Sequence, residues 1–158
     1  MKMFKVLLVL VVAFSAQAAF AQSGKQLVKT AAADIEAGVS TKESISNRQA
    51  ALKWTIETEE ISLIACGATF GPFVAKKNKN GGALTEAYMI GMADYRINNP
   101  DAEENAVQQA GVELALKVYD RLVKEKPKTK FKEVDDLITK RDNGQLKYFI
   151  TAADCGKK

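Results

Sequence analysis

Apolar side chains recur at helical spacing through the middle of the chain, most clearly between Gly81 and Arg96. A stripe of large residues advances by four, four and three positions, and its members are Leu84, Tyr88, Met92 and Tyr95. A second line contains small residues four positions apart, namely Ala83, Ala87 and Gly91. Large residues bury one face of a helix, while small ones let a second helix backbone approach closely. The pattern therefore predicts a central helix with neighbours on two sides.

Two helices are predicted before this one. Val28, Ala31 and Ile35 share one face of the segment 25–37, and Gly38 follows at a typical helix C′ position. The run Ser40-Thr41-Lys42-Glu43 then has the form of a capping box, which predicts the start of a second helix. Its apolar stripe continues through the segment 61–70, until Gly71-Pro72 kinks or stops it. The residues of this stripe are Ile45, Gln49, Leu52, Ile56 and Leu63.

The segment from Trp54 to Ile64 carries conflicting signals. Trp54, Ile56 and Thr58 alternate with polar residues, which is typical of a strand. A capping signal precedes the segment and no partner strand is evident, so helix is the favoured interpretation, with a break near Thr58 or a strand as alternatives.

Three helices are predicted after the central one. Asn99 and Pro100 are suited to the N-cap and N1 positions of a long helix of about 25 residues, which Lys126-Pro127 should end. Phe131 begins the pattern of a short helix that stops at Asp142-Asn143-Gly144, and the last helix lies within 145–155. The expected fold is all-α, a small bundle of five or six helices. Its expected core includes Leu52, Ile56, Leu63, Leu114, Val118 and Phe149.

The first 21 residues have the order of a secretory signal peptide. Lys2 and Lys5 precede the apolar run 6–14, and Ala19-Phe20-Ala21 provides a small-residue cleavage site. The apolar run is too short to span a bilayer. We expect residues 22–158 to form one helical domain, periplasmic or secreted, with no stable membrane anchor. Cleavage removes two lysines and no acid, so the net charge falls from +4 to +2, which gives little support to nucleic-acid binding.

The chain has two cysteines, Cys66 and Cys155. In an exported protein an even number of cysteines predicts disulfide bonding, so we expect these two to pair. Two thiols without any histidine make a poor zinc site, and the cysteines are too far apart for a C-x-x-C redox motif. The bond should fasten the C-terminus to the second helix.

The sequence contains few of the residue types and spacings that enzymes use for catalysis. Histidine is absent, which removes the usual general base and the commonest metal ligand. Glu86 and Asp94 are eight residues apart on the central helix, about 12 Å of rise, which is too far for a shared proton. No motif for a cofactor or metal stands out, so we expect a protein that is not an enzyme.

Two charged regions are candidate contact surfaces: the basic loop Lys76–Asn80, and the acidic cluster Glu57, Glu59 and Glu60. Lysines also occupy every second position from Lys124 to Lys132. Acidic residues are interspersed there and aromatic residues are scarce, so this run indicates a solvated helix end.

The run Tyr88-Met89-Ile90-Gly91-Met92-Ala93-Asp94 resembles the Tyr-aliphatic-x-Gly-aliphatic-x-Asp helix of the Rap/Tai family. These are small periplasmic helical proteins that protect cells against type VI secretion effectors. Family members commonly carry a cysteine just before the tyrosine, where this chain has Glu86 and Ala87. The resemblance implies a structural motif at Tyr88, Gly91 and Asp94, and a toxic protein as the partner.

Two hypotheses for the function follow. The first is an exported binding protein that neutralises a toxic effector, which needs only a rigid helical surface and a stable disulfide. The second is a periplasmic envelope-stress or structural protein with another envelope protein as its partner.

Overall fold

Every regular element within residues 24–155, the part of the chain that the computed structural model describes, is helical. The predicted signal peptide lies outside these residues. The elements in order are a helix at 24–37, α2 (Lys42–Glu57), α3 (Gly67–Val74), α4 (Gly81–Asn98), α5 (Glu104–Glu125), the 3₁₀ turn η1 (Pro127–Thr129), α6 (Lys132–Asp142) and α7 (Leu146–Ala153). The all-α prediction is confirmed, with one α-helix more than the upper expectation because the predicted second helix is divided into α2 and α3.

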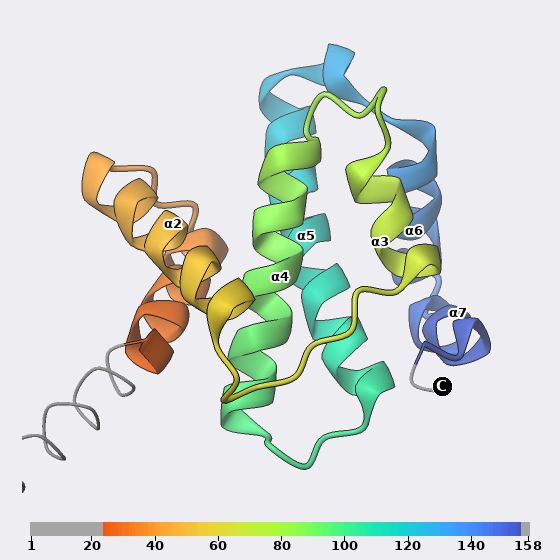
Figure 1. Ribbon diagram of the computed structural model, residues 1–158. Coiled ribbons are helices and arrows are strands. Elements are labelled where there is room, and N and C mark those ends of the chain that lie inside the picture. The colour runs from red at the N-terminus through yellow and green to blue at the C-terminus, as the bar shows by residue number, and fades with distance from the viewer. Residues whose placement is uncertain (1–23, 156–158) are drawn as a thin grey trace, which may run out of the picture.

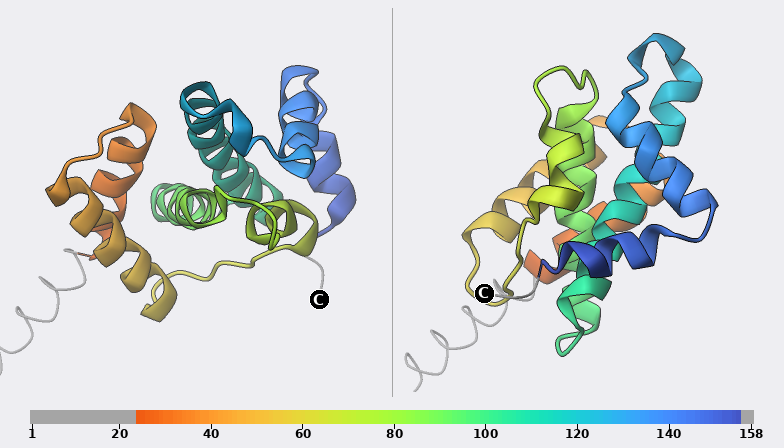
Figure 2. Two further views of the ribbon diagram at one scale, coloured as in Figure 1. Left: turned by 90° about the horizontal axis from the view of Figure 1, so that it is seen from above. Right: turned by 90° about the vertical axis from the view of Figure 1, so that its right-hand side faces the viewer.

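The central helix is α4, as predicted. It packs against α5 on one side and is also in contact with α2 and α3. Figure 2 shows the resulting arrangement: the helix at 24–37 pairs with α2 on one side of α4, while α3, α6 and α7 lie on the other. The buried residues that α4 contributes are Leu84, Ala87, Tyr88, Ile90, Gly91, Met92 and Ala93.

Two glycines allow the close contact between α4 and α5. A Cβ at Gly91 would lie 3.0 Å from the Leu114 Cβ and 3.1 Å from the Ala110 carbonyl oxygen. The approach at Gly111 is tighter, since a Cβ there would lie 2.7 Å from the Tyr88 carbonyl oxygen. The small-residue line on α4 therefore marks a real helix crossing, although Ala83 at its start is exposed.

The favoured continuous second helix is wrong, and the alternative of a break near Thr58 is confirmed, because α2 ends at Glu57. The Thr58 N–H bonds to the Trp54 carbonyl at the end of α2, and residues 58–66 form neither helix nor strand. The apolar stripe was placed on the wrong face, because Ile56 is 66% exposed. Small residues instead bury the inner face of α2, and these are Ser44, Ala51 and Thr55.

Three other details of the prediction were wrong. Thr41, rather than Ser40, caps α2, since its Oγ1 accepts the Ser44 N–H at 3.1 Å. Of the two alternatives at Gly71-Pro72, a kink or a stop, the stop is wrong, because Pro72 lies inside α3. Asn99 does not begin the next helix: its N–H bonds to the Tyr95 carbonyl at the end of α4, and residues 99–103 are used to reverse the chain before α5 begins.

The observed core also differs from the expected set of six residues. Of the six named residues, Leu114 is buried and Ile56 is exposed. The other four are partly buried against the core, and these are Leu52, Leu63, Val118 and Phe149. The turn predictions at Gly38 and Gly144 are confirmed, with φ values of 73° and 68°.

Candidate interaction surface

The predicted disulfide is present. Cys66 and Cys155 are bonded, with their Cα atoms 5.4 Å apart and 89 positions between them in the sequence. Cys66 is the residue that immediately precedes α3. The bond therefore joins the end of the chain to the start of α3, and the expectation that it would reach the second helix was wrong because that helix ends before Cys66.

Residues 58–66, here called the strap, cross in front of the lower parts of α4 and α5 and connect α2 with α3 (Figure 1). The strap has no backbone ladder of its own, so its position depends on side-chain contacts. Glu60 forms an ion pair with Lys25 at 2.9 Å. Near the other end, the Gln108 side chain donates a hydrogen bond to the Ile64 carbonyl oxygen, and Cys66 is held by the disulfide.

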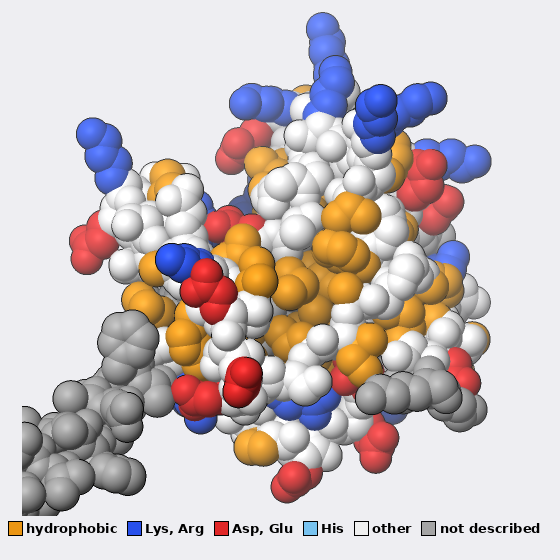
Figure 3. Space-filling model, in the orientation of Figure 1, with side chains coloured by type: hydrophobic (Ala, Val, Ile, Leu, Met, Phe, Trp, Pro, Cys, Tyr) orange, Lys and Arg blue, Asp and Glu red, His pale blue; other side chains and the backbone are white. Residues whose placement is uncertain are grey.

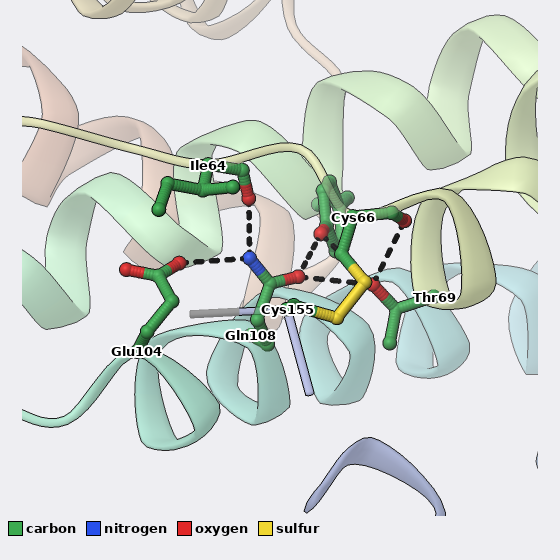
Figure 4. Close-up of a disulfide and its surroundings, with 7 residues drawn as sticks. Ile64, Cys66, Thr69, Glu104, Gln108 and Cys155 are labelled. Atoms are coloured by element: carbon green, nitrogen blue, oxygen red, sulfur yellow. Dashed lines mark hydrogen bonds between the residues drawn. A yellow bond between two sulfur atoms is a disulfide. The ribbon is translucent and has the colours of Figure 1, made fainter. Parts of the chain in front are cut away.

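Gln108 lies at the centre of a buried polar network beside the disulfide (Figure 4). Its Oε1 accepts hydrogen bonds from the Tyr88 hydroxyl and from the Thr69 hydroxyl, the latter at 2.9 Å. Its Nε2 donates to the Ile64 carbonyl and to the Glu104 carboxylate at 2.8 Å. One side chain on α5 thereby connects the strap, α3 and α4. Buried amides need such partners because an unpaired polar group loses its bonds to water.

The network extends to an ion pair at the turn between α4 and α5. Arg96 contacts Glu104 at 2.8 Å and donates to the Ala102 carbonyl oxygen at 2.6 Å. Burial raises the pKa of the Tyr88 hydroxyl, and the hydrogen bond with Thr69 opposes that shift. Tyr88 therefore stays protonated and acts as a hydrogen-bond donor inside the core.

Sequence reasoning assigned no role to Gln108, although a signal existed. Val107, Gly111 and Leu114 recur at helical spacing on the buried side of α5, and Gln108 adjoins them on that side. A polar residue in an apolar stripe predicts either a local defect or a buried hydrogen-bonding centre.

We expect the substitution Gln108→Ala to lower the free energy of unfolding by about 2 to 4 kcal/mol, because it leaves a cavity and removes the partners of several buried groups. Gln109→Ala is the matched control, since Gln109 is half-buried and makes one hydrogen bond, to Glu113 at 2.7 Å. Its effect should stay within about 0.5 kcal/mol. Urea denaturation followed by circular dichroism measures both, and equal losses would contradict the central role of Gln108.

The strap and α3 present apolar side chains to solvent. Figure 3 shows hydrophobic side chains gathered across the face on which these two segments lie. Ile64 is 36% exposed and Val74 is 51% exposed, while three further residues are partly buried against the core. We call this set the apolar face, and its members are Ile61, Leu63, Ile64, Phe70 and Val74. A contiguous apolar area with a polar rim is typical of a protein-binding surface.

The three motif residues have separate positions. Tyr88 belongs to the buried network, and Gly91 lies at the crossing with α5. Asp94 is half-buried, accepts a hydrogen bond from Asn98 at 3.2 Å, and is close enough to Lys29 to interact with its charge. Burial is the main cause of the raised pKa of Asp94. The motif thus supports the packing of α4 on several sides and does not form a single site.

The structure also places the basic loop Lys76–Asn80 and the acidic residues that the sequence singled out. In the basic loop, Asn78 and Asn80 are buried, and the Asn78 side chain donates to the Pro72 carbonyl at 3.0 Å. The acidic cluster is exposed: Glu57 is the last residue of α2, and Glu59 and Glu60 are part of the strap. Glu86 faces Arg48 at 3.6 Å, and burial raises its pKa while Arg48 opposes the shift.

A cleft of about 400 Å³ lies beside the strap. Residues from three stretches of the chain line this cleft, and they include Lys25, Ile61, Arg96 and Pro100.

No group of three His, Cys, Asp or Glu side chains within residues 24–155 is placed to hold a metal ion. None of the helices in that range combines the length and apolar character needed to cross a bilayer.

Comparison of the chain with protein-family models, curated proteins and solved structures finds no match.

Proposed function

We propose that this chain is an exported binding protein, without catalytic activity of its own, that neutralises a toxic effector protein. The observation that carries the proposal is the apolar face on the strap and α3. Ile64 and Val74 expose large side chains there, although the protein buries many others of the same kind. The resemblance of the segment Tyr88–Asp94 to the Rap/Tai immunity proteins supports the same class of partner.

The apolar face suits a binding role because its backbone is fixed before a partner arrives. The disulfide holds the end of the strap at Cys66, and Gln108 holds the carbonyl oxygen of Ile64. A surface that is already ordered loses little conformational entropy on binding, which favours high affinity. The disulfide also fits an oxidising, exported compartment.

Deletion of the gene and challenge with sibling cells tests the proposal. Deleted cells should be killed on contact, and protein exported from a plasmid should restore survival. The neighbouring reading frame should encode the toxin. Full survival of the deleted strain, together with sensitivity to acid or envelope stress, would contradict the proposal and favour the envelope-stress alternative.

A double variant tests the surface itself. Ile64→Glu with Val74→Glu places two charges on the apolar face at positions that are already solvent-exposed, so the fold should persist while protection is lost. The control is Ile45→Glu with Tyr148→Glu, on α2 and α7, where the side chains are 38% and 78% exposed. Control cells should survive the challenge. Equal protection by both double variants would exclude the apolar face as the contact surface.

A further inference from the structure

Two lysine-rich loops that are far apart in the sequence lie together at one end of the molecule. Residues 75–80 connect α3 with α4, and residues 126–131 connect α5 with α6. The Asn80 side chain donates a hydrogen bond to the Thr129 carbonyl oxygen at 3.0 Å, which joins the two loops directly. Figure 1 and both views of Figure 2 place them at the same end of the helix pair α4 and α5.

This end carries eight exposed lysines, which we call the lysine apex. They are Lys76, Lys77, Lys79, Lys124, Lys126, Lys128, Lys130 and Lys132. Within the described part of the chain none of the eight forms an ion pair with a carboxylate. Figure 3 shows basic side chains projecting into solvent around this end.

The lysine apex concentrates positive charge in a chain whose described residues carry equal numbers of basic and acidic side chains. Of the 23 basic residues, four lie outside residues 24–155, so 19 basic side chains face 19 acidic ones in that range. Eight of the 19 basic groups are at the apex. The acidic residues beside it in sequence are Glu125, Glu133, Asp135 and Asp136, and Asp135 is engaged by the Tyr119 hydroxyl at 2.7 Å. Positive charge therefore dominates this end, and the rest of the surface has an acidic excess.

The chemistry of the apex favours a phospholipid surface over other polyanions. Every basic group there is a lysine, which acts as a hydrated point charge and lacks the planar fork with which arginine reads phosphates on bases or proteins. Phe131 is the aromatic residue in these loops, and it is half-buried against the core, so it offers no stacking platform for nucleic-acid bases. Lysine is also depleted in protein interfaces. An anionic membrane surface attracts clusters of roughly four to eight basic residues, with about 1 kcal/mol for each lysine or arginine near the surface.

We propose that the lysine apex docks this protein reversibly on the surface of membranes that contain anionic phospholipids. Both loops contribute, because each presents three lysines to the same surface. The strap crosses α4 and α5 near their opposite ends (Figure 1), so most of the apolar face stays accessible while the protein is docked. The proposal is independent of the identity of any protein partner.

Sedimentation with vesicles tests the docking, using the exported protein without residues 1–21. Vesicles of phosphatidylethanolamine and phosphatidylglycerol should bind it at low salt, and binding should fall as salt screens the charges. Vesicles of phosphatidylcholine should not bind it. Each lysine at an anionic surface contributes roughly a fivefold gain in affinity. Replacing the three lysines of either loop by glutamine should therefore weaken binding about 100-fold; the two variants are K76Q/K77Q/K79Q and K126Q/K128Q/K130Q.

The matched control removes the same charge elsewhere. The triple variant K29Q/K42Q/K147Q alters exposed lysines on the helix at 24–37, α2 and α7, and it should bind vesicles as the unaltered protein does. Circular dichroism melting of each variant confirms that the fold is intact. Four results would overturn the proposal: equal loss in the control, loss with one loop variant alone, displacement by millimolar inorganic phosphate, or tighter binding to a DNA duplex than to the vesicles.

Discussion

Replacement of Cys66 and Cys155 by serine should lower the free energy of unfolding by about 4 to 5 kcal/mol. The bond closes a loop with a sequence separation of 89 residues, and a loop of that length loses much conformational entropy in the unfolded chain when it is cross-linked. The corresponding fall in melting temperature is about 10 to 15 °C. Differential scanning calorimetry of the double variant measures it.

The same experiment has an internal check. Reduction of the unaltered protein should lower its melting temperature to that of the double variant, whereas the reductant should leave the variant unchanged. Alkylation without reductant should label no thiol, since the described residues contain no free cysteine. Labelling of two thiols in freshly exported protein, or a melting temperature that does not respond to reduction, would contradict the prediction.

Substitution of Gly111 should produce the other large effect. An alanine Cβ there would lie 2.7 Å from the Tyr88 carbonyl oxygen and 2.5 Å from the Met92 Cγ, and the backbone oxygen cannot rotate away. Gly111→Ala should therefore destabilise the protein by about 1 to 3 kcal/mol through overpacking, although alanine normally stabilises a helix relative to glycine by about 1 kcal/mol. Urea denaturation measures the change.

Two other glycines give a graded comparison. Gly91→Leu should also cost about 1 to 3 kcal/mol, because its larger side chain meets Leu114 and the Ala110 carbonyl oxygen at the same crossing. Gly82→Ala is the control: this position is in α4, and nothing lies within 4 Å of its added Cβ. It should be neutral or stabilising by up to about 1 kcal/mol. Equal midpoints for Gly82→Ala and Gly111→Ala would show that α4 and α5 do not cross closely at Gly111.

These experiments distinguish residues that hold the apolar face in place from residues that would contact a partner. The disulfide and Gln108 hold the strap, whereas Ile64 and Val74 expose side chains that a partner would cover. Loss of the disulfide should therefore reduce both stability and protection. Charges introduced at Ile64 and Val74 should reduce protection alone.

Local patterns were enough to predict much of the fold. The spacing of Leu84, Tyr88 and Met92 determined that α4 is a helix with a buried face, because helical periodicity is a property of neighbouring residues. The cysteine count, taken together with a predicted export signal, predicted the pairing of Cys66 with Cys155. The stops at Gly38, Pro127 and Gly144 followed from backbone preferences that act within a few residues.

Local patterns did not decide which face of α2 is buried or where that helix ends. The apolar stripe through Ile56 competes with a face of small residues, and packing against α4 favours the small face because it permits closer contact. The strap then follows from contacts with distant residues, chiefly Gln108, which is 44 positions beyond Ile64. Such contacts contribute nothing to the local preference of residues 58–66, so periodicity alone cannot reveal them.

The two surfaces for which we propose functions were decided by the tertiary structure. The lysine run from Lys124 to Lys132 indicated a solvated helix end when considered alone. The packing of α4 against α5 brings the second basic loop beside it, where Asn80 donates a hydrogen bond to the Thr129 carbonyl oxygen. The apolar face likewise combines the strap with α3 after the disulfide has fixed Cys66. The sequence determined the helices because their signals are local, whereas the surfaces depend on which distant segments are packed side by side.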